Sequence, residues 1–158
     1  MSEHTVIFRL ADPEHQLAAV RLVQDVRIPG DRLGFHRSGD RWELVIDRPP
    51  VNRMEYLLEL QHQDGGAETV LDPRNRQQVA GAFGMKSVLE FPDYTPPGWL
   101  SIAAEPGNVT NVDVQVKALD AAVSAWVWSP GGSRHNERLP LLVVHDGPEY
   151  DTLASLTH

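Results

Sequence analysis

Short apolar runs of strand length recur along residues 1–91, and in the clearest of them apolar and polar residues alternate with the period of a β-strand. In Arg41–Asp47 the residues Trp42, Leu44 and Ile46 share one face, because successive side chains of a strand point to opposite sides. The turn residues Ser38-Gly39-Asp40 come just before, which indicates a hairpin. Other short apolar runs that read as strands are Val6–Leu10, Tyr56–Leu60, Glu68–Leu71 and Ser87–Phe91. Short strands separated by turn signals about every ten residues predict an all-β sandwich.

The segment from Asp12 to Gln24 has two interpretations. Asp12 could cap a helix with Pro13 in its first turn, since both residues are favoured at helix starts. However, Val20, Leu22 and Gln24 also alternate with their neighbours as in a strand. We favour a strand that begins at about Ala18, with at most one helical turn before it.

Residues 92–107 form a predicted linker. Pro92, Pro96, Pro97 and Gly98 crowd its first half, and such a sequence neither continues a helix nor fits inside a sheet. Beyond it, residues 110–118 and 121–129 alternate again and predict two antiparallel strands. Trp126 and Trp128 would lie on one face of the second strand and pack on the sheet.

Leu139–Val144 differs from the earlier strands because it is almost continuously apolar. Such a run predicts a strand buried on both faces, as in the middle of an α/β sheet. His145-Asp146-Gly147-Pro148 follows as a tight loop, and residues 149–156 read as the start of a helix. Ligands bind at the carboxyl ends of strands in such sheets, where backbone amides can stabilise an oxyanion. The alternative interpretation is a simple tight turn with Gly147 in the left-handed conformation.

Composition narrows the class of protein. The chain has 158 residues, 41% of them hydrophobic and 23% charged, as expected for a globular protein. Its net charge of −8 argues against a nucleic-acid partner. Its apolar runs are far shorter than the roughly 20 residues that cross a bilayer, so we expect no membrane partner. The chain lacks cysteine, and its start has no signal-peptide pattern, so we expect a cytoplasmic protein without disulfides.

The usual catalytic motifs are absent from the sequence. The seven histidines include no pair at the i, i+4 spacing of a helical zinc site, and we expect no bound metal. No serine lies in a G-x-S-x-G nucleophile elbow. We therefore expect no catalytic residue within this chain, and His145 to Glu149 remains its strongest candidate site.

The sequence from Leu139 to Asp151 resembles the first parallel strand and oxyanion loop of the enterochelin-esterase-like family of α/β hydrolases. Upstream, the chain is similar to the early-set immunoglobulin-like domain that precedes the hydrolase domain in those enzymes. The matching segments are Val20-Arg-Leu-Val, Trp42-Glu-Leu, Glu55-Tyr-Leu-Leu and Asp72-Pro. The resemblance implies a mainly β chain in three parts: an immunoglobulin-like β-sandwich (1–91), the proline-rich linker (92–107) and the opening strands of an incomplete α/β-hydrolase domain (108–158).

The resemblance also implies an activity, that of a serine esterase with a Ser-His-Asp/Glu triad outside this chain and no cofactor. The candidate oxyanion donors are Asp146, Gly147 or Glu149, because Pro148 has no N–H, and His145 would help shape the loop. We do not assign His158 as the triad base. We expect as partners an ester substrate and either the missing hydrolase portion or a second chain that covers the residues after Pro130.

A rival interpretation is a non-enzymatic immunoglobulin-like module that binds a carbohydrate or a protein. Related sugar-binding modules use exposed aromatic residues after the second strand, and residues 25–34 contain none. We place Trp42 in the core, because it alternates with other core positions.

Overall fold

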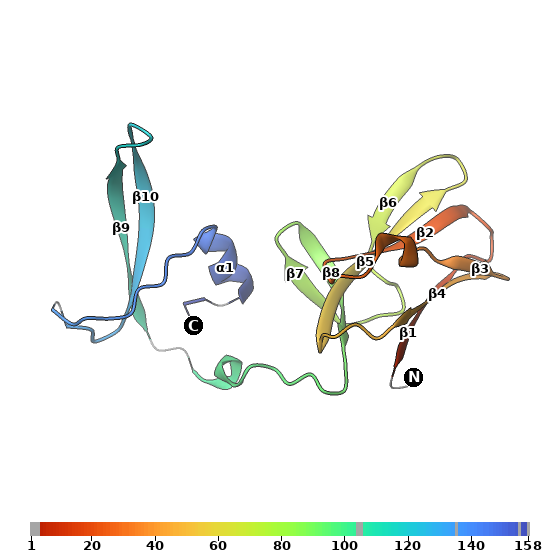
Figure 1. The fold of residues 1–158 in the computed structure, drawn as a ribbon, viewed down its shortest axis with the longest axis horizontal. Helices are drawn as coiled ribbons and strands as arrows, with labels where there is room; N and C mark the ends of the chain where they lie inside the picture. Colours follow the sequence, from red (N-terminus) through yellow and green to blue (C-terminus); the bar gives the residue numbers. More distant parts are fainter. Residues whose placement is uncertain (1–3, 104–105, 135, 155, 158) are drawn as a thin grey trace. The chain divides into compact units, whose positions relative to one another are not determined.

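The computed structural model describes residues 4–103, 106–134, 136–154 and 156–157 (Figure 1). The chain divides into two compact units, Met1–Thr95 and Pro96–His158, and the boundary between them falls within the predicted linker. β-Strands make up most of the regular secondary structure in both units, so the prediction of a mainly β chain is confirmed. Among the described residues, no helix is long and apolar enough to cross a membrane.

Two antiparallel sheets build the first unit. One sheet has the strand order β1-β4-β3, and the other has the order β2-β5-β8-β7 with β6 also paired to β5. The strands of the first sheet are β1 (Thr5–Ala11), β3 (His36–Ser38) and β4 (Arg41–Asp47). Those of the second are β2 (Leu17–Gln24), β5 (Arg53–His62), β6 (Ala67–Val70), β7 (Gln78–Gly81) and β8 (Gly84–Glu90). This arrangement is a β-sandwich, as the sequence predicted.

Alternation along the strands produces the core of the sandwich. Every second residue of β1, β4 and β5 is buried, and Trp42 is only 7% exposed, so its predicted place in the core is confirmed. The buried apolar residues of these strands are Val6, Phe8, Leu10, Trp42, Leu44, Ile46, Met54, Tyr56, Leu58 and Leu60. Burying side chains of this size stabilises a fold by about 1.5–3 kcal/mol each.

The predicted turns are present as well. Gly39 has a φ of 61° between β3 and β4, and Gly65 has a φ of 89° between β5 and β6. Both values lie in the left-handed region that glycine enters without steric cost. The segment after Asp12 is a turn followed by β2, so the strand that we favoured is confirmed and the helical alternative is wrong.

Asp12 joins the two sheets at one corner of the sandwich. Its buried carboxylate accepts hydrogen bonds from the backbone N–H of Gln16 at 2.8 Å and of Leu17 at 3.3 Å. It also accepts from Arg37 Nη2 at 2.6 Å and Trp42 Nε1 at 3.1 Å. Burial by itself would raise the pKa of Asp12, but these hydrogen bonds outweigh it and hold the pKa below its usual value.

Arg37 completes this corner. Its guanidinium lies over the ring of Trp42, 4.6 Å from the ring centroid, and donates a second hydrogen bond to the carbonyl oxygen of Leu17 at 2.9 Å. Cation–π stacking and the ion pair to Asp12 therefore act on the same side chain. The result is a fixed connection between β3, β4 and the start of β2.

A second buried polar group anchors the loop after β6. The Tyr56 hydroxyl donates to Asp72 Oδ2 at 2.8 Å and accepts from Asn75 Nδ2 at 3.1 Å. The backbone N–H of Asp72 donates to Ser87 Oγ at 2.9 Å. Burial raises the pKa of Tyr56, and the Asp72 carboxylate raises it further against the opposing effect of Asn75. Tyr56 therefore stays neutral and holds the loop on the sheet.

The second unit contains a long hairpin of β9 (Gly107–Val116) and β10 (Ala121–Pro130), a short 3-10 helix (Gly98–Ser101) and α1 (Gly147–Ala154). The two predicted strands and the terminal helix are thus confirmed, although α1 begins two residues earlier than expected.

The predicted packing of the two tryptophans of β10 is largely wrong. They share one face, but Trp126 is 66% and Trp128 39% exposed. Trp128 lies against the backbone of Gly107, where a Cβ would come within 2.1 Å of its Nε1. Trp128 is therefore better covered than Trp126, although both remain exposed.

The prediction of a buried strand at Leu139–Val144 is wrong. The segment has no regular secondary structure, and Leu141 is 86% exposed. A strand buried on both faces requires neighbouring strands and covering helices, and no described strand pairs with this segment. The apolar composition alone therefore does not make a strand here.

We predict that Asp12→Asn lowers the free energy of unfolding by about 2–3 kcal/mol at pH 7, because the partly buried Arg37 loses its counter-charge. The pKa of Asp12 is lowered in the folded protein, so its stabilisation is complete above the unfolded-state value of about 4 and declines below it. The difference between wild type and variant should therefore shrink as the pH falls below about 4. Urea unfolding of wild type and variant, repeated across this pH range, measures the difference. The control is Asp31→Asn, which removes an exposed carboxylate instead. Equal stability of Asp12→Asn and wild type at pH 7 would contradict the prediction.

We also predict that Tyr56→Phe costs about 1–3 kcal/mol of stability, since it leaves the buried Asp72 carboxylate without its hydroxyl donor. Tyr94→Phe is the matched control, because the Tyr94 hydroxyl makes no hydrogen bond within the described residues. Thermal unfolding of both variants provides the comparison. Similar melting temperatures for the two would show that the Tyr56 network contributes little.

Candidate functional site

The predicted oxyanion loop lies at the start of α1. Asp146 has a φ of 54°, and its carbonyl oxygen accepts a hydrogen bond from the N–H of Tyr150 at 3.1 Å. Gly147 is the first residue of the helix and is not in the left-handed region. The alternative with Gly147 in the left-handed conformation is therefore wrong. Asp146 takes that conformation instead, as aspartate does more readily than most residues.

The first turn of α1 supplies the amide groups that the prediction requires. The first amides of an α-helix have no carbonyl partner inside the helix, and their partial positive charge favours anions. Pro148 has no N–H, so Gly147 and Glu149 carry these amides in the first turn. The exposed carboxylate of Glu149 also lies in this turn and suits the positive end of the helix dipole.

His145, Asp146 and Glu149 are exposed, and they come together only because they are neighbours in sequence. Within the described residues the side chain of His145 makes no hydrogen bond or ion pair. Its assignment as a loop-shaping residue stays a prediction. His158 lies outside the described residues.

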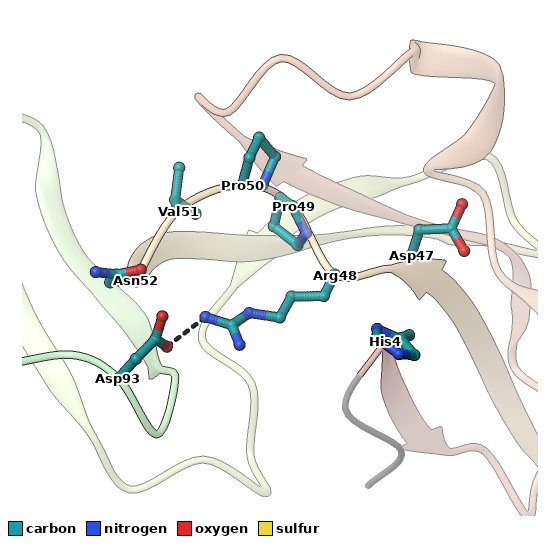
Figure 2. A pocket seen from close by; sticks show the side chains of 8 residues that line it. All are labelled: His4, Asp47, Arg48, Pro49, Pro50, Val51, Asn52 and Asp93. Atoms are coloured by element: carbon teal, nitrogen blue, oxygen red, sulfur yellow. Dashed lines mark hydrogen bonds and ion pairs between the residues drawn. The ribbon is translucent and has the colours of Figure 1, made fainter.

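A separate hollow of about 830 Å³ opens on the sandwich (Figure 2). Arg48 points across it to form an ion pair with Asp93, and its guanidinium lies 4.5 Å from the centroid of the Phe91 ring. Local sequence reasoning could not find this pair, because its members are 45 residues apart. The lining residues are His4, Asp47, Arg48, Pro49, Pro50, Val51, Asn52 and Asp93.

The ion pair in this hollow has a structural role. The Arg48 cation is neutralised by Asp93 and covered by Phe91, so it is not free to bind an anion. Among the residues that the structure describes, no group of three His, Asp or Glu side chains could hold a metal ion. The loop at His145–Glu149 therefore remains the candidate functional site.

No family model matches this chain, and no curated protein sequence matches it. Among solved structures, the chain is similar to enterobactin esterase from Shigella flexneri, crystallised in the presence of enterobactin, at 18% identity and a TM-score of 0.49. A crystal structure of enterochelin esterase from the same organism gives 15% identity and a TM-score of 0.47. Both similarities cover 80% of this chain and 40% of the other. Pullulanase from Bacillus acidopullulyticus is similar at 19% identity and a TM-score of 0.42, over 66% of this chain and 13% of that one. The chain thus spans 40% of the length of the esterases that it matches.

Proposed function

We propose that this chain is the N-terminal portion of a serine esterase of the enterochelin-esterase-like family, with its triad outside these residues. The observation that carries the proposal is the left-handed Asp146 directly before the first turn of α1. It places a sharp turn and then free helix amides at the position where the sequence resembles an oxyanion loop. The β-sandwich upstream is the kind of domain that precedes the hydrolase in that family.

The proposed reaction is acyl transfer to water. A serine hydroxyl attacks the ester carbonyl while the triad histidine takes its proton, and the carbonyl oxygen becomes an oxyanion. The amides of Gly147 and Glu149, or that of Asp146, would donate hydrogen bonds to this oxyanion. Collapse of the intermediate releases the alcohol, and water then releases the acid from the serine. This chain would contribute transition-state stabilisation, not the nucleophile.

The direct test is hydrolysis of a small chromogenic ester, with enterobactin as a second substrate. We expect no turnover by residues 1–158 alone, because they lack a nucleophile elbow. We expect turnover when the complete gene product, or a copurifying polypeptide, supplies a serine in a G-x-S-x-G turn. If neither contains such a serine, or if the complete protein leaves both esters intact, the proposal is wrong. Saturable binding of an oligosaccharide or a protein by an inactive complete protein would favour a binding module.

Two substitutions at one position test the role of the loop conformation in the complete enzyme. Asp146→Gly keeps the left-handed φ available, whereas Asp146→Val makes it strongly unfavourable for a β-branched residue. Both remove the same carboxylate. We expect Asp146→Gly to retain kcat within a few-fold and Asp146→Val to lose about 100-fold, as for the loss of one oxyanion donor. Equal kcat values for the two variants would exclude the proposed role of this turn.

A further inference from the structure

The edge of β4 is only partly covered in the sandwich. β3 pairs with β4 over residues 41–43, and its last pair is His36 with Glu43. Upstream of His36 the chain leaves this sheet and joins the other one, where Phe35 N–H donates to Val20 O at 2.9 Å and Leu33 O accepts from Leu22 N–H at 2.9 Å. No described strand therefore lies beside residues 44–47 on the β3 side.

The backbone pattern shows which groups face this open edge. Arg48 N–H donates to His4 O at 2.9 Å, and Asp40 O accepts from Asp12 N–H at 2.8 Å, so even-numbered residues of this region bond toward β1. In an antiparallel ladder successive residues point their backbone groups to opposite sides. The N–H and C=O groups of Val45 and Asp47 therefore point away from β1, to the side that β3 leaves uncovered.

A hollow of about 540 Å³ lies along this edge. Its lining residues come from β4, from the loop after β4 and from the segment after β2: Arg27, Ile28, Pro29, Arg32, Gly34, His36, Leu44, Val45, Ile46, Asp47, Arg48, Pro49 and Pro50. Pro49 and Pro50 follow Arg48 on the loop of Figure 2 and end the edge, because proline has no N–H to offer a further strand. The open edge is thus short and bounded.

The charge of this hollow is opposite to that of the protein. Arg27 and Arg32 are exposed, and neither makes an ion pair with a described residue. Asp47 is the single acidic residue in the lining. The net charge of the whole chain is −8, so two unpaired guanidiniums beside free backbone groups mark a local preference for an acidic ligand.

We propose that this edge binds an extended acidic peptide segment, which adds a strand to β4 beside Val45 and Asp47. Backbone hydrogen bonds to these two residues would give affinity, as in other cases of β-strand addition. Arg27 and Arg32 would select carboxylate side chains. This binding site is independent of the proposed esterase activity.

The test uses a fluorescent blocked peptide in which Glu and Val alternate, titrated into the full chain and followed by anisotropy. We expect saturable binding that weakens at high salt, and much weaker binding of the same peptide with Lys in place of Glu. The double variant Arg27→Gln/Arg32→Gln should bind about tenfold more weakly. Its control is Arg74→Gln/Arg76→Gln, which makes the same charge change outside this hollow and should bind as wild type does.

A second pair of variants tests the backbone contact. Val45→Pro removes the N–H that faces the open edge, which an edge strand tolerates, and should weaken binding about tenfold. Val45→Thr keeps this N–H and should bind as wild type does. Peptide binding should also slow hydrogen exchange at the amides of Val45 and Asp47. The inference is wrong if binding is absent, if the Lys peptide binds equally well, or if the arginine double variant has no effect. Equally tight binding of free glutamate would show a small-anion site instead.

Discussion

The buried carboxylate of Asp12 determines how the two sheets of the first unit meet. Removing a carboxylate from water is unfavourable unless several donors replace the lost hydration. The four donors here come from the turn before β2, from β2 itself, from β3 and from β4. Because all four must converge on one group, the turn after β1, the position of β3 and the orientation of the Trp42 indole are fixed together.

The uncovered edge of β4 follows from the same arrangement. Arg37 lies on β3 and is held by Asp12 and Trp42, so β3 stays on β4 near the hairpin turn. Two residues upstream, Phe35 is buried in the core and bonded to β2 of the opposite sheet. Residues 36–38 pair with β4, whereas Phe35 already bonds to the other sheet, so this segment does not extend beside residues 44–47. The hollow beside Val45 is thus a geometric consequence of the corner that Asp12 stabilises.

The sequence predicted the elements whose signals are local. Alternation around Trp42 predicted β4, the apolar run Tyr56–Leu60 predicted β5, and glycines in turn sequences predicted the turns at Gly39 and Gly65. β7 (Gln78–Gly81) gave no such signal, because four residues with a single large apolar side chain show no clear period. The Arg48–Asp93 pair and the open edge of β4 depend on which strands become neighbours in space. No pattern within one segment reports that.

In the candidate loop, too, the features that depend on neighbouring residues were predictable, and the one that depends on a distant partner was not. The helix at its end was predictable from the residues that form it, and the left-handed turn was misassigned by only one position, from Asp146 to Gly147. Leu139–Val144 was predicted as a strand from its apolar composition, although a strand forms only with a partner.

The two units therefore differ in the interactions that stabilise them. The sandwich has a buried core of its own, whereas the second unit offers its hairpin mainly backbone hydrogen bonds, and an isolated two-stranded hairpin is marginal in water. Substitutions in the sandwich should consequently act through its own packing. The turn at Asp146 instead follows an exposed apolar segment that pairs with no described strand, so it depends on the local hydrogen bond from Tyr150 N–H to Asp146 O.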